Sequence, residues 1–327
     1  MIAHPEQVNG NYRSLPLQHL RERGHFVHVE TGSLSFGELA DFDVAHIYRF
    51  ANRELRGLVR QLREHGVAIV WDNDDDMASG DDRRRGALRS QSEVAGVREM
   101  LSLAHVVTTP SQLLAETYRA GGAREALVVD NFLPAWFSHR PETAAGEVRV
   151  GWVASKEHRD DLEALGIADL LAAALERHPA LHVESVGIHL KLRSDRYRNT
   201  MHLPFDRLPA RLARFDIGIA PLADTPFNRA RSTVKLKEYA SCGAAWLASA
   251  TGPYRDLGAT EGGLLVPDDG WADALDRLIA DRRERQKLAA SGNKWAQSQM
   301  ANREANVTSW EHAIVRAHEL AGAAVAA

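Results

Sequence analysis

The sequence predicts an α/β protein built from two doubly wound domains. Short apolar runs alternate with one-sided helical patterns along the whole chain, and the alternation restarts after an irregular polar segment at 131–146. Strands that alternate with helices form mainly parallel sheets covered on both faces. The length of 327 residues also suits two domains, because a domain usually takes roughly 100–200 residues.

The first domain is expected over 1–138. Its predicted strands are short, rich in β-branched residues and followed by polar or turn residues. They are 26–30, 43–48, 67–71, 105–109 and 126–130. The apolar stripe within 55–62 and the Pro-Ser entry to 111–120 predict helices between the strands.

The second domain is expected over 148–327. Its predicted strands are 148–154, 182–187, 200–204, 216–221, 244–249 and 263–267, with helices near 160–177 and 232–242. The last fifty residues are expected to be helical, with an apolar stripe from Val307 to Ala321. The stripe alone leaves open whether this terminal helix caps its own domain or packs back across the first.

Composition excludes several classes of protein. The formal net charge is −4, so the chain has no overall basic field of the kind that drives nonspecific binding to nucleic acid. The lone Cys242 forms neither an internal disulfide nor a zinc cluster. No apolar run approaches the roughly 18–20 residues that span a bilayer, and no signal peptide is visible. We therefore expect a cytoplasmic protein with no integral membrane segment; a homodimer is compatible with the sequence.

The segment 221–254 is the most informative part of the chain. It reads as a strand end, a polar loop, a helix that Ser232 is expected to cap, and a stop at Gly243. Arg231, Lys235 and Glu238 are spaced by four and three residues, which places them on one helix face. A helix start flanked by two cations suits a diphosphate, and a carboxylate one turn further suits a ribose diol. The competing interpretation is a solvated face with a Lys235–Glu238 ion pair.

This segment resembles the donor-binding segment of retaining glycosyltransferase family 4. The closest branch has the pattern Phe-Asn-x-x-Lys/Arg-Ser-x-x-Lys-x-x-Glu-Tyr. The matching residues are Phe227, Asn228, Arg231, Ser232, Lys235, Glu238 and Tyr239. The resemblance implies a GT-B fold, in which two Rossmann-like domains enclose a cleft and a long helix ends the chain. It further implies that Glu238 binds the nucleotide ribose and that the basic residues bind the diphosphate.

Weaker matches extend the resemblance to most of the chain. Ser155, Lys156 and His158 follow the first strand of the second domain. Gly10, Tyr12 and Arg13 lie in the first helix, where the resemblance places them near the phosphate or acceptor. Apart from Tyr12, these residues complete the expected donor site together with Asn228, Ser232, Thr233 and Tyr239. Two positions depart from the family. Ala230 stands where many members carry a glutamate that touches the transferred sugar, and Trp152 stands where arginine is common.

An acidic run, 72–76, follows the predicted strand 67–71, and three interpretations of it compete. Asp72 and Asp74 line the cleft and touch sugar or acceptor hydroxyls, as expected at the carboxyl end of a strand. Alternatively the run is an Asp-x-Asp site for Mg²⁺ or Mn²⁺, or only a solvated loop. The basic run 83–89 that follows is either a contact for an anionic acceptor or lipid headgroups, or a solvated loop.

These observations predict a glycosyltransferase with retention of configuration and without metal or other cofactor. Arg231 and Lys235 would stabilise the leaving diphosphate, so no side-chain nucleophile is required. Asp72 and Asp74 are the other catalytic candidates. The partners expected are a nucleotide-sugar donor and an unidentified acceptor: a small molecule, a glycan, a lipid or a modified nucleic acid. The alternatives are a nucleotide-sugar epimerase or hydrolase of the same fold, and a catalytically silent nucleotide-sugar-binding subunit.

Overall fold

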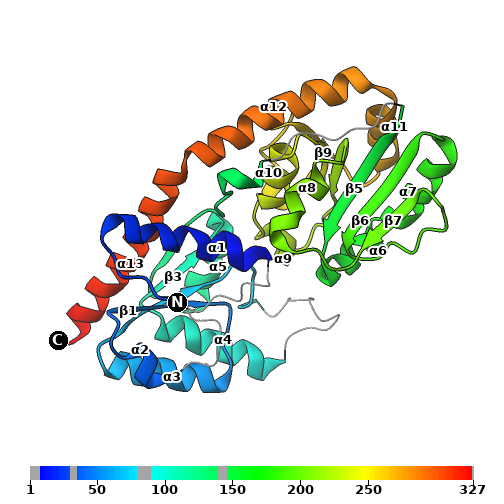
Figure 1. The fold of residues 1–327 in the computed structure, drawn as a ribbon. Helices are drawn as coiled ribbons and strands as arrows, with labels where there is room; N and C mark the ends of the chain where they lie inside the picture. Colours follow the sequence, from blue (N-terminus) through cyan, green and yellow to red (C-terminus); the bar gives the residue numbers. More distant parts are fainter. Residues whose placement is uncertain (1–7, 30–34, 80–89, 139–145, 326–327) are drawn as a thin grey trace.

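The computed structural model describes residues 8–29, 35–79, 90–138 and 146–325. Within them the chain forms two parallel sheets, which lie in separate lobes joined near residue 138 and again by the C-terminal helices (Figure 1). We call the lobe around the first sheet the N-terminal lobe and the lobe around the second sheet the C-terminal lobe. The α/β class and the two-sheet architecture agree with the sequence prediction.

In the N-terminal lobe, four strands pair in the order β1-β2-β3-β4. The strands are β1 Val44–Tyr48, β2 Ala68–Asp72, β3 Val106–Thr109 and β4 Ala126–Val128. The helices of this part of the chain are α1 Val8–Gln18, η1 His19–Arg23, α2 Phe36–Leu39, α3 Arg53–Glu64, α4 Gln91–Leu103 and α5 Gln112–Ala120. Side chains of α3, α4 and α5 bury one face of the sheet around Trp71. The short η2, Ala135–Phe137, leads out of the lobe.

In the C-terminal lobe, six strands pair in the order β10-β9-β8-β5-β6-β7. The strands are β5 Val148–Ala154, β6 Leu181–Gly187, β7 Tyr197–Thr200, β8 Ile217–Ala220, β9 Ala245–Ser249 and β10 Gly263–Val266. The helices are η3 Lys156–His158, α6 Arg159–Ala164, α7 Ile167–Arg177, η4 Phe205–Arg207, α8 Leu208–Leu212, α9 Pro226–Arg229, α10 Val234–Ser241, η5 Gly252–Tyr254 and α11 Trp271–Ala280. The chain runs outward from β5 in one direction and returns to β8 in the other. The strand order therefore reverses between β5 and β8, where open α/β sheets bind ligands.

Local sequence explains where several helices begin and end. Asn52 caps α3 by accepting a bond from Leu55 N at 2.8 Å, and Ser111 caps α5 by accepting from Leu114 N at 3.2 Å. After α10, Gly243 adopts a φ of 80°, a left-handed conformation that suits glycine and stops a helix. The expected glycine stop of this helix is present.

Two long helices close the chain and connect the lobes. Helix α12, Arg282–Ala301, packs on α10 and β9, and α13, Arg303–Val325, crosses to the N-terminal lobe (Figure 1). There Ala313, Ala317 and Leu320 bury the face of the first sheet opposite to α3 and α4. The stripe residues Val307, Trp310 and Ala321 are also buried. Among the described residues, no helix combines the length and apolar character needed to cross a membrane.

Three expected elements are wrong in detail. Residues 26–29 form no regular structure, because no described strand pairs with the free edge of β1. The strand expected at 200–204 lies at Tyr197–Thr200, where it pairs with Val183 to Val186 of β6. The helix expected near 160–177 is broken by Gly166, whose φ is 58°. The basic run 83–89 lies outside the described residues.

Candidate active site between the lobes

A small cavity of about 140 Å³ lies where the two lobes meet. The N-terminal lobe contributes Asp74 and Asp75. The C-terminal lobe contributes Val153, Ala154, Ser155, Glu157, His158, Arg231, Ser232, Val234, Lys235, Glu238 and Tyr254. The structure therefore brings seven of the predicted site residues together: Asp74, Ser155, His158, Arg231, Ser232, Lys235 and Glu238.

The topology explains why these residues meet. Ser155 to His158 follow the carboxyl end of β5, and the 221–233 loop leads from the end of β8 into α10. These two strands flank the reversal of strand order in the second sheet. The acidic run follows the end of β2 in the other sheet, so the ligand-binding edges of the two sheets face one cavity.

Lys235 projects from α10 into this cavity. Its ammonium group donates a hydrogen bond to the carbonyl of Val153 at the end of β5. Burial lowers the pKa of Lys235 to about 8, although the neighbouring carboxylate of Glu238 opposes the shift. A cation with one carbonyl partner and a depressed pKa gains most from an arriving anion, which would restore its charge.

Glu238 lies one turn further along α10 and is only 4% exposed. Its Oε1 accepts a hydrogen bond of 2.5 Å from the hydroxyl of Tyr12. Burial raises the pKa of Glu238, and the charge of Lys235 and the Tyr12 bond act against that rise. Lys235 and Glu238 therefore share a secluded site, and the interpretation of this helix face as solvated is wrong for these two residues.

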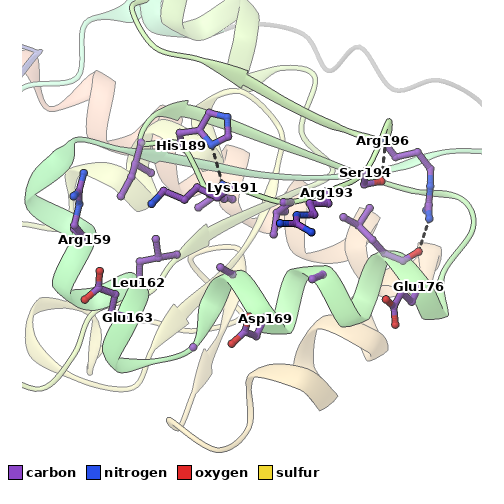
Figure 2. Close-up of a pocket in the computed structure, with 17 residues that line it drawn as sticks. Arg159, Leu162, Glu163, Asp169, Glu176, His189, Lys191, Arg193, Ser194 and Arg196 are labelled. Carbon is purple, nitrogen blue, oxygen red and sulfur yellow. Dashed lines mark hydrogen bonds between the residues drawn. The ribbon is translucent and has the colours of Figure 1, made fainter.

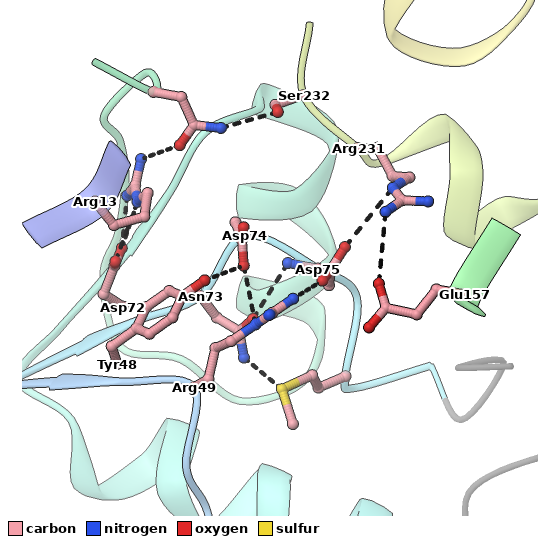
Figure 3. Close-up of polar contacts among 12 residues, drawn as sticks. Arg13, Tyr48, Arg49, Asp72, Asn73, Asp74, Asp75, Glu157, Arg231 and Ser232 are labelled. Carbon is pink, nitrogen blue, oxygen red and sulfur yellow. Dashed lines mark hydrogen bonds and ion pairs between the residues drawn. The ribbon is translucent and has the colours of Figure 1, made fainter. Parts of the chain in front are cut away.

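Arg231 sits at the entrance to α10 with incomplete pairing (Figure 3). Its Nε is 3.8 Å from Asp75 Oδ1 and one terminal nitrogen is 3.9 Å from Glu157 Oε2, both longer than a hydrogen bond. The other terminal nitrogen is buried and has no hydrogen-bond partner in the described part of the chain. A buried guanidinium with an unused donor is suited to an anionic oxygen.

His158, which lines the cavity, pairs with Asp161, which does not line it. The His158 Nδ1 and Asp161 Oδ2 are 2.9 Å apart, and Asp161 Oδ1 accepts from Asn228 Nδ2 at 2.6 Å. Burial, with a further contribution from Arg231, lowers the pKa of His158 to about 3. His158 is therefore neutral at ordinary pH. Asn228 is absent from the cavity lining; it holds the 221–233 loop against Asp161.

The acidic run is buried, so the interpretation as a solvated loop is wrong. Asp72 is fully buried in an ion pair with Arg13, whose terminal nitrogen lies 2.5 Å from Asp72 Oδ1. Asp72 also accepts from Thr108 Oγ1 at 2.7 Å. The structure thus removes both Asp72 and Arg13 from the cavity, because each is the other's partner in the protein interior. Burial raises the pKa of Asp72, and Arg13 opposes the rise.

The other carboxylates of the run are also hydrogen-bonded to, or ion-paired with, groups of the protein. Asp74 accepts from the Tyr48 hydroxyl at 2.9 Å and lies 3.1 Å from Arg49 Nε (Figure 3). Asp75 pairs with Arg49 as well. Asp76 accepts from the backbone amides of Ala78 and Ser79 at 2.9 and 3.0 Å. Across the described residues, no group of three or more His, Cys, Asp or Glu is arranged to hold a metal ion.

The remaining predicted residues take other positions. Thr233, and not Ser232, is the N-cap of α10 and makes no side-chain cap; the Ser232 hydroxyl accepts from Asn131 Nδ2 at 2.9 Å. Tyr239 is buried in the core, where its hydroxyl donates to Ile219 O and accepts from Val153 N. Gly10 lies in α1. Lys156 lies in η3, and its side chain is outside what the structure describes.

One wider cavity adjoins this site, and another lies apart from it in the C-terminal lobe. One, of about 630 Å³, runs between the start of α5 and residues 252–256 and shares Arg231 and Ser232 with the small cavity. Thr233 lines this wider space. Another, of about 800 Å³, lies in the C-terminal lobe between α7 and residues 188–196 (Figure 2). It contains none of the predicted site residues.

Sequence reasoning did not single out three contributors to the site, and it placed a fourth, Tyr12, near the phosphate or acceptor without its contact to Glu238. Asp75, Glu157 and Tyr254 line the cavity, and Tyr12 reaches Glu238 from α1. Asp75 was visible only as one of four carboxylates, and nothing in the pattern distinguished it. Tyr254 and Tyr12 are distant from α10 in the sequence, so only the fold brings them close. Ala230, at the position of the absent glutamate, packs in the apolar cluster of the N-terminal lobe and does not line the cavity.

Comparison with known proteins also points to the part of the chain that contains α10. Residues 159–308, which include α10 and the cavity-lining residues from Arg231 to Tyr254, match the protein-family model described as glycosyl transferase-like. No curated protein sequence matches the chain.

Solved structures with a similar fold cover nearly the whole chain. Sucrose-phosphate synthase from Thermosynechococcus elongatus is 16% identical with a TM-score of 0.64, covering 94% of this chain and 77% of its own. HepE from Anabaena in complex with UDP and glucose is 16% identical with a TM-score of 0.62, covering 89% and 87%. A UDP-forming trehalose-phosphate synthase from Burkholderia vietnamiensis is 14% identical with a TM-score of 0.58, covering 96% and 76%. The chain has the GT-B fold, and its glycosyl transferase-like domain supports its assignment as a glycosyltransferase.

Proposed function

We propose that this protein transfers a sugar from a nucleoside diphosphate to an acceptor hydroxyl, with retention of configuration and without a metal ion. In this proposal the C-terminal domain, 148–327, holds the donor. The N-terminal domain, 1–138, holds the acceptor. The resemblance of 221–239 to the donor segment of retaining family 4 supports the assignment of retention.

The observation that carries the proposal is the convergence of Arg231, Lys235 and Glu238 on one interlobe cavity. The three side chains offer two cations and one carboxylate to the same small volume. The two cations suit a diphosphate, and the carboxylate suits the hydroxyl groups of a ribose. Their burial strengthens both interactions, because the interior screens charge less than water does.

Charge stabilisation is sufficient for the chemistry. As the bond between the sugar and the diphosphate breaks, negative charge grows on the leaving oxygen, and Arg231 and Lys235 are positioned to neutralise it. The diphosphate oxygen can then accept the proton of the acceptor hydroxyl, so no protein nucleophile is needed. Because the cations supply the charge that a metal would otherwise supply, the proposed reaction runs without one.

The small cavity is too small to hold a whole nucleotide-sugar donor by itself. About 140 Å³ is smaller than the roughly 300–1,000 Å³ of pockets that take drug-sized ligands. The donor therefore extends into the adjoining 630 Å³ cavity or enters after the lobes separate. Closure around the bound donor would then exclude water and limit its hydrolysis.

The nucleobase can be identified by thermal unfolding in the presence of UDP-, GDP-, ADP- and TDP-sugars. A ligand that binds only the folded chain raises Tm, and the rise grows with the logarithm of its concentration relative to Kd. UDP-sugars are the first candidates, because HepE was solved with UDP-glucose and the trehalose-phosphate synthases are UDP-forming. Absence of stabilisation by all four classes would contradict the proposal.

Product analysis separates transfer from the alternatives. A transferase consumes donor in proportion to added acceptor and releases the nucleoside diphosphate. An epimerase or hydrolase consumes donor without acceptor, and a silent binding subunit is stabilised by the donor yet releases nothing. A screen of sugar, glycan and lipid acceptors with the stabilising donor distinguishes these outcomes.

A further inference from the structure

Tyr12 connects the beginning of the chain to the C-terminal lobe. It lies on α1, yet its fully buried ring belongs to the apolar cluster beneath α8 and α10. The ring packs edge-on against Phe205 at a centroid distance of 5.0 Å and against Phe137 at 6.0 Å. These ring contacts fix the direction of the hydroxyl group.

The hydroxyl of Tyr12 holds one half of the Glu238 carboxylate. It donates to Oε1 at 2.5 Å, between two residues separated by 226 positions in the sequence. The second oxygen, Oε2, has no hydrogen-bond partner among the described residues, while Glu238 lines the interlobe cavity. One oxygen is therefore fixed by the protein and the other is offered to a ligand.

The neighbouring Arg13 reaches the other end of the same segment. Its guanidinium binds Asp72 and lies 3.5 Å from Asn131 Oδ1, and Asn131 Nδ2 donates to Ser232 at 2.9 Å (Figure 3). Helix α1 thus reaches the 232–238 segment directly at Glu238 through Tyr12, and indirectly at Ser232 through Arg13 and Asn131. This arrangement is well suited to setting the orientation of α10 side chains.

We propose that Tyr12 is a positioning residue for the donor, which orients the Glu238 carboxylate so that Oε2 accepts a hydroxyl of the ribose. The inference rests on the proposed function. The competing possibility is that the Tyr12 hydroxyl occupies the place of a ribose hydroxyl and must be displaced. The two possibilities predict opposite effects when the hydroxyl is removed.

Tyr12→Phe removes the hydroxyl and keeps the ring contacts. Titration calorimetry of the full chain with UDP, and with GDP, ADP and TDP where UDP does not bind, should show about tenfold weaker binding, as expected for loss of a hydrogen bond to a charged group. The matched control is Tyr197→Phe. That hydroxyl bonds Ser185 Oγ at 2.8 Å and Leu190 N at 2.9 Å away from the cavity, so its removal should leave the affinity unchanged.

Two readouts distinguish positioning from a merely structural role. In a Glu238→Gln background, Tyr12→Phe should have little further effect, because the residue acts through the carboxylate. The Tyr12 bond also lowers the pKa of Glu238. The pH below which nucleotide binding is lost should therefore move upward in Tyr12→Phe, and this acid limb should be absent from Glu238→Gln.

Thermal unfolding without ligand checks that the variants are folded. Should Tyr12→Phe fail to fold, Glu238→Asp keeps the charge and withdraws the carboxylate from Tyr12, and the same loss of affinity is expected. Unchanged affinity in the tested variant would overturn the inference and leave the proposed function standing, and tighter binding by Tyr12→Phe would mean that the hydroxyl blocks the site. If the wild-type chain binds none of the four nucleotides, both the inference and the proposed function fail.

Discussion

The acidic run after β2 and the helix α10 face the same cavity from opposite lobes, but they differ in what they leave unpaired. Each carboxylate of the run has protein donors: Arg13 for Asp72, Tyr48 and Arg49 for Asp74. On the other side, Arg231 retains a buried nitrogen without a partner and Lys235 reaches only a carbonyl. The position of a charged residue at a strand end thus predicts that it lies near the cavity. Whether the residue can bind a ligand depends on the charged and polar partners that the rest of the fold brings to it.

The sharpest test of this difference is Asp72→Asn. Because the substitution leaves the buried Arg13 guanidinium without its counter-charge, we expect a loss of about 3–5 kcal/mol in the free energy of unfolding. Urea denaturation measures it. Asp276→Asn is the matched control, since Asp276 pairs with Arg177 at the surface, and its loss should cost under about 1 kcal/mol. Equal effects of the two substitutions would contradict the assignment of Asp72 as an interior anchor.

Two lysines of α10 allow a comparison within one helix. Lys235 faces the cavity and Lys237 pairs with Asp130 on another face. Lys235→Ala should lower kcat by about 10²-fold, as for loss of a group that stabilises transition-state charge. Lys237→Ala should lower Tm and leave kcat within a few-fold of wild type. Steady-state kinetics with the identified donor checks both, and a comparable kcat for the two variants would argue against a role for Lys235.

The depressed pKa of Lys235, about 8, predicts a pH dependence. The side chain is charged below that value and neutral above it, so affinity for a nucleoside diphosphate should fall as pH rises through 8. The decrease is at most about tenfold per pH unit, because one proton is involved. Lys235→Arg should remove this limb, since arginine stays charged throughout. Titrations between pH 7 and pH 10 measure it, and the same slope in both proteins would exclude Lys235 as its origin.

The smallest effect is expected from chelation. If Arg231 and Lys235 supply the charge that the diphosphate needs, turnover in 5 mM EDTA should equal turnover in its absence. Collapse of activity with EDTA, and its recovery with Mg²⁺ or Mn²⁺, would transfer the role to a metal ion and favour the Asp-x-Asp interpretation of the acidic run.

The sequence predicted the class and order of most elements because apolar periodicity reports burial directly. It failed where pairing partners decide the outcome. Residues 26–29 alternate like a strand but do not pair with β1, whose outer edge carries no described strand, and the strand expected at 200–204 lies earlier because it pairs with Val183 to Val186 of β6.

The same limit applies to the site. Lys235 and Glu238 were identifiable because a single helix fixes their spacing, and Arg231 because it immediately precedes that helix. Arg13 and Asp72 were assigned to the ligand because their mutual contact spans 59 positions. The contact of Tyr12 with Glu238 was not predicted for a similar reason, because the two residues are separated by 226 positions. Local pattern predicts which residues share a helix face; it does not predict which charges neutralise each other across the fold.

The position of α13 has a consequence for how the molecule assembles during translation. Its side chains cover Ala68, Val70 and Val106 on the first sheet, yet the ribosome makes this helix only after the entire C-terminal lobe. The nascent N-terminal lobe must therefore emerge with an apolar sheet face exposed, a state prone to aggregation. The two lobes are consequently separate units of architecture but not of folding, and a fragment that ends near residue 138 would lack the cover for its own sheet.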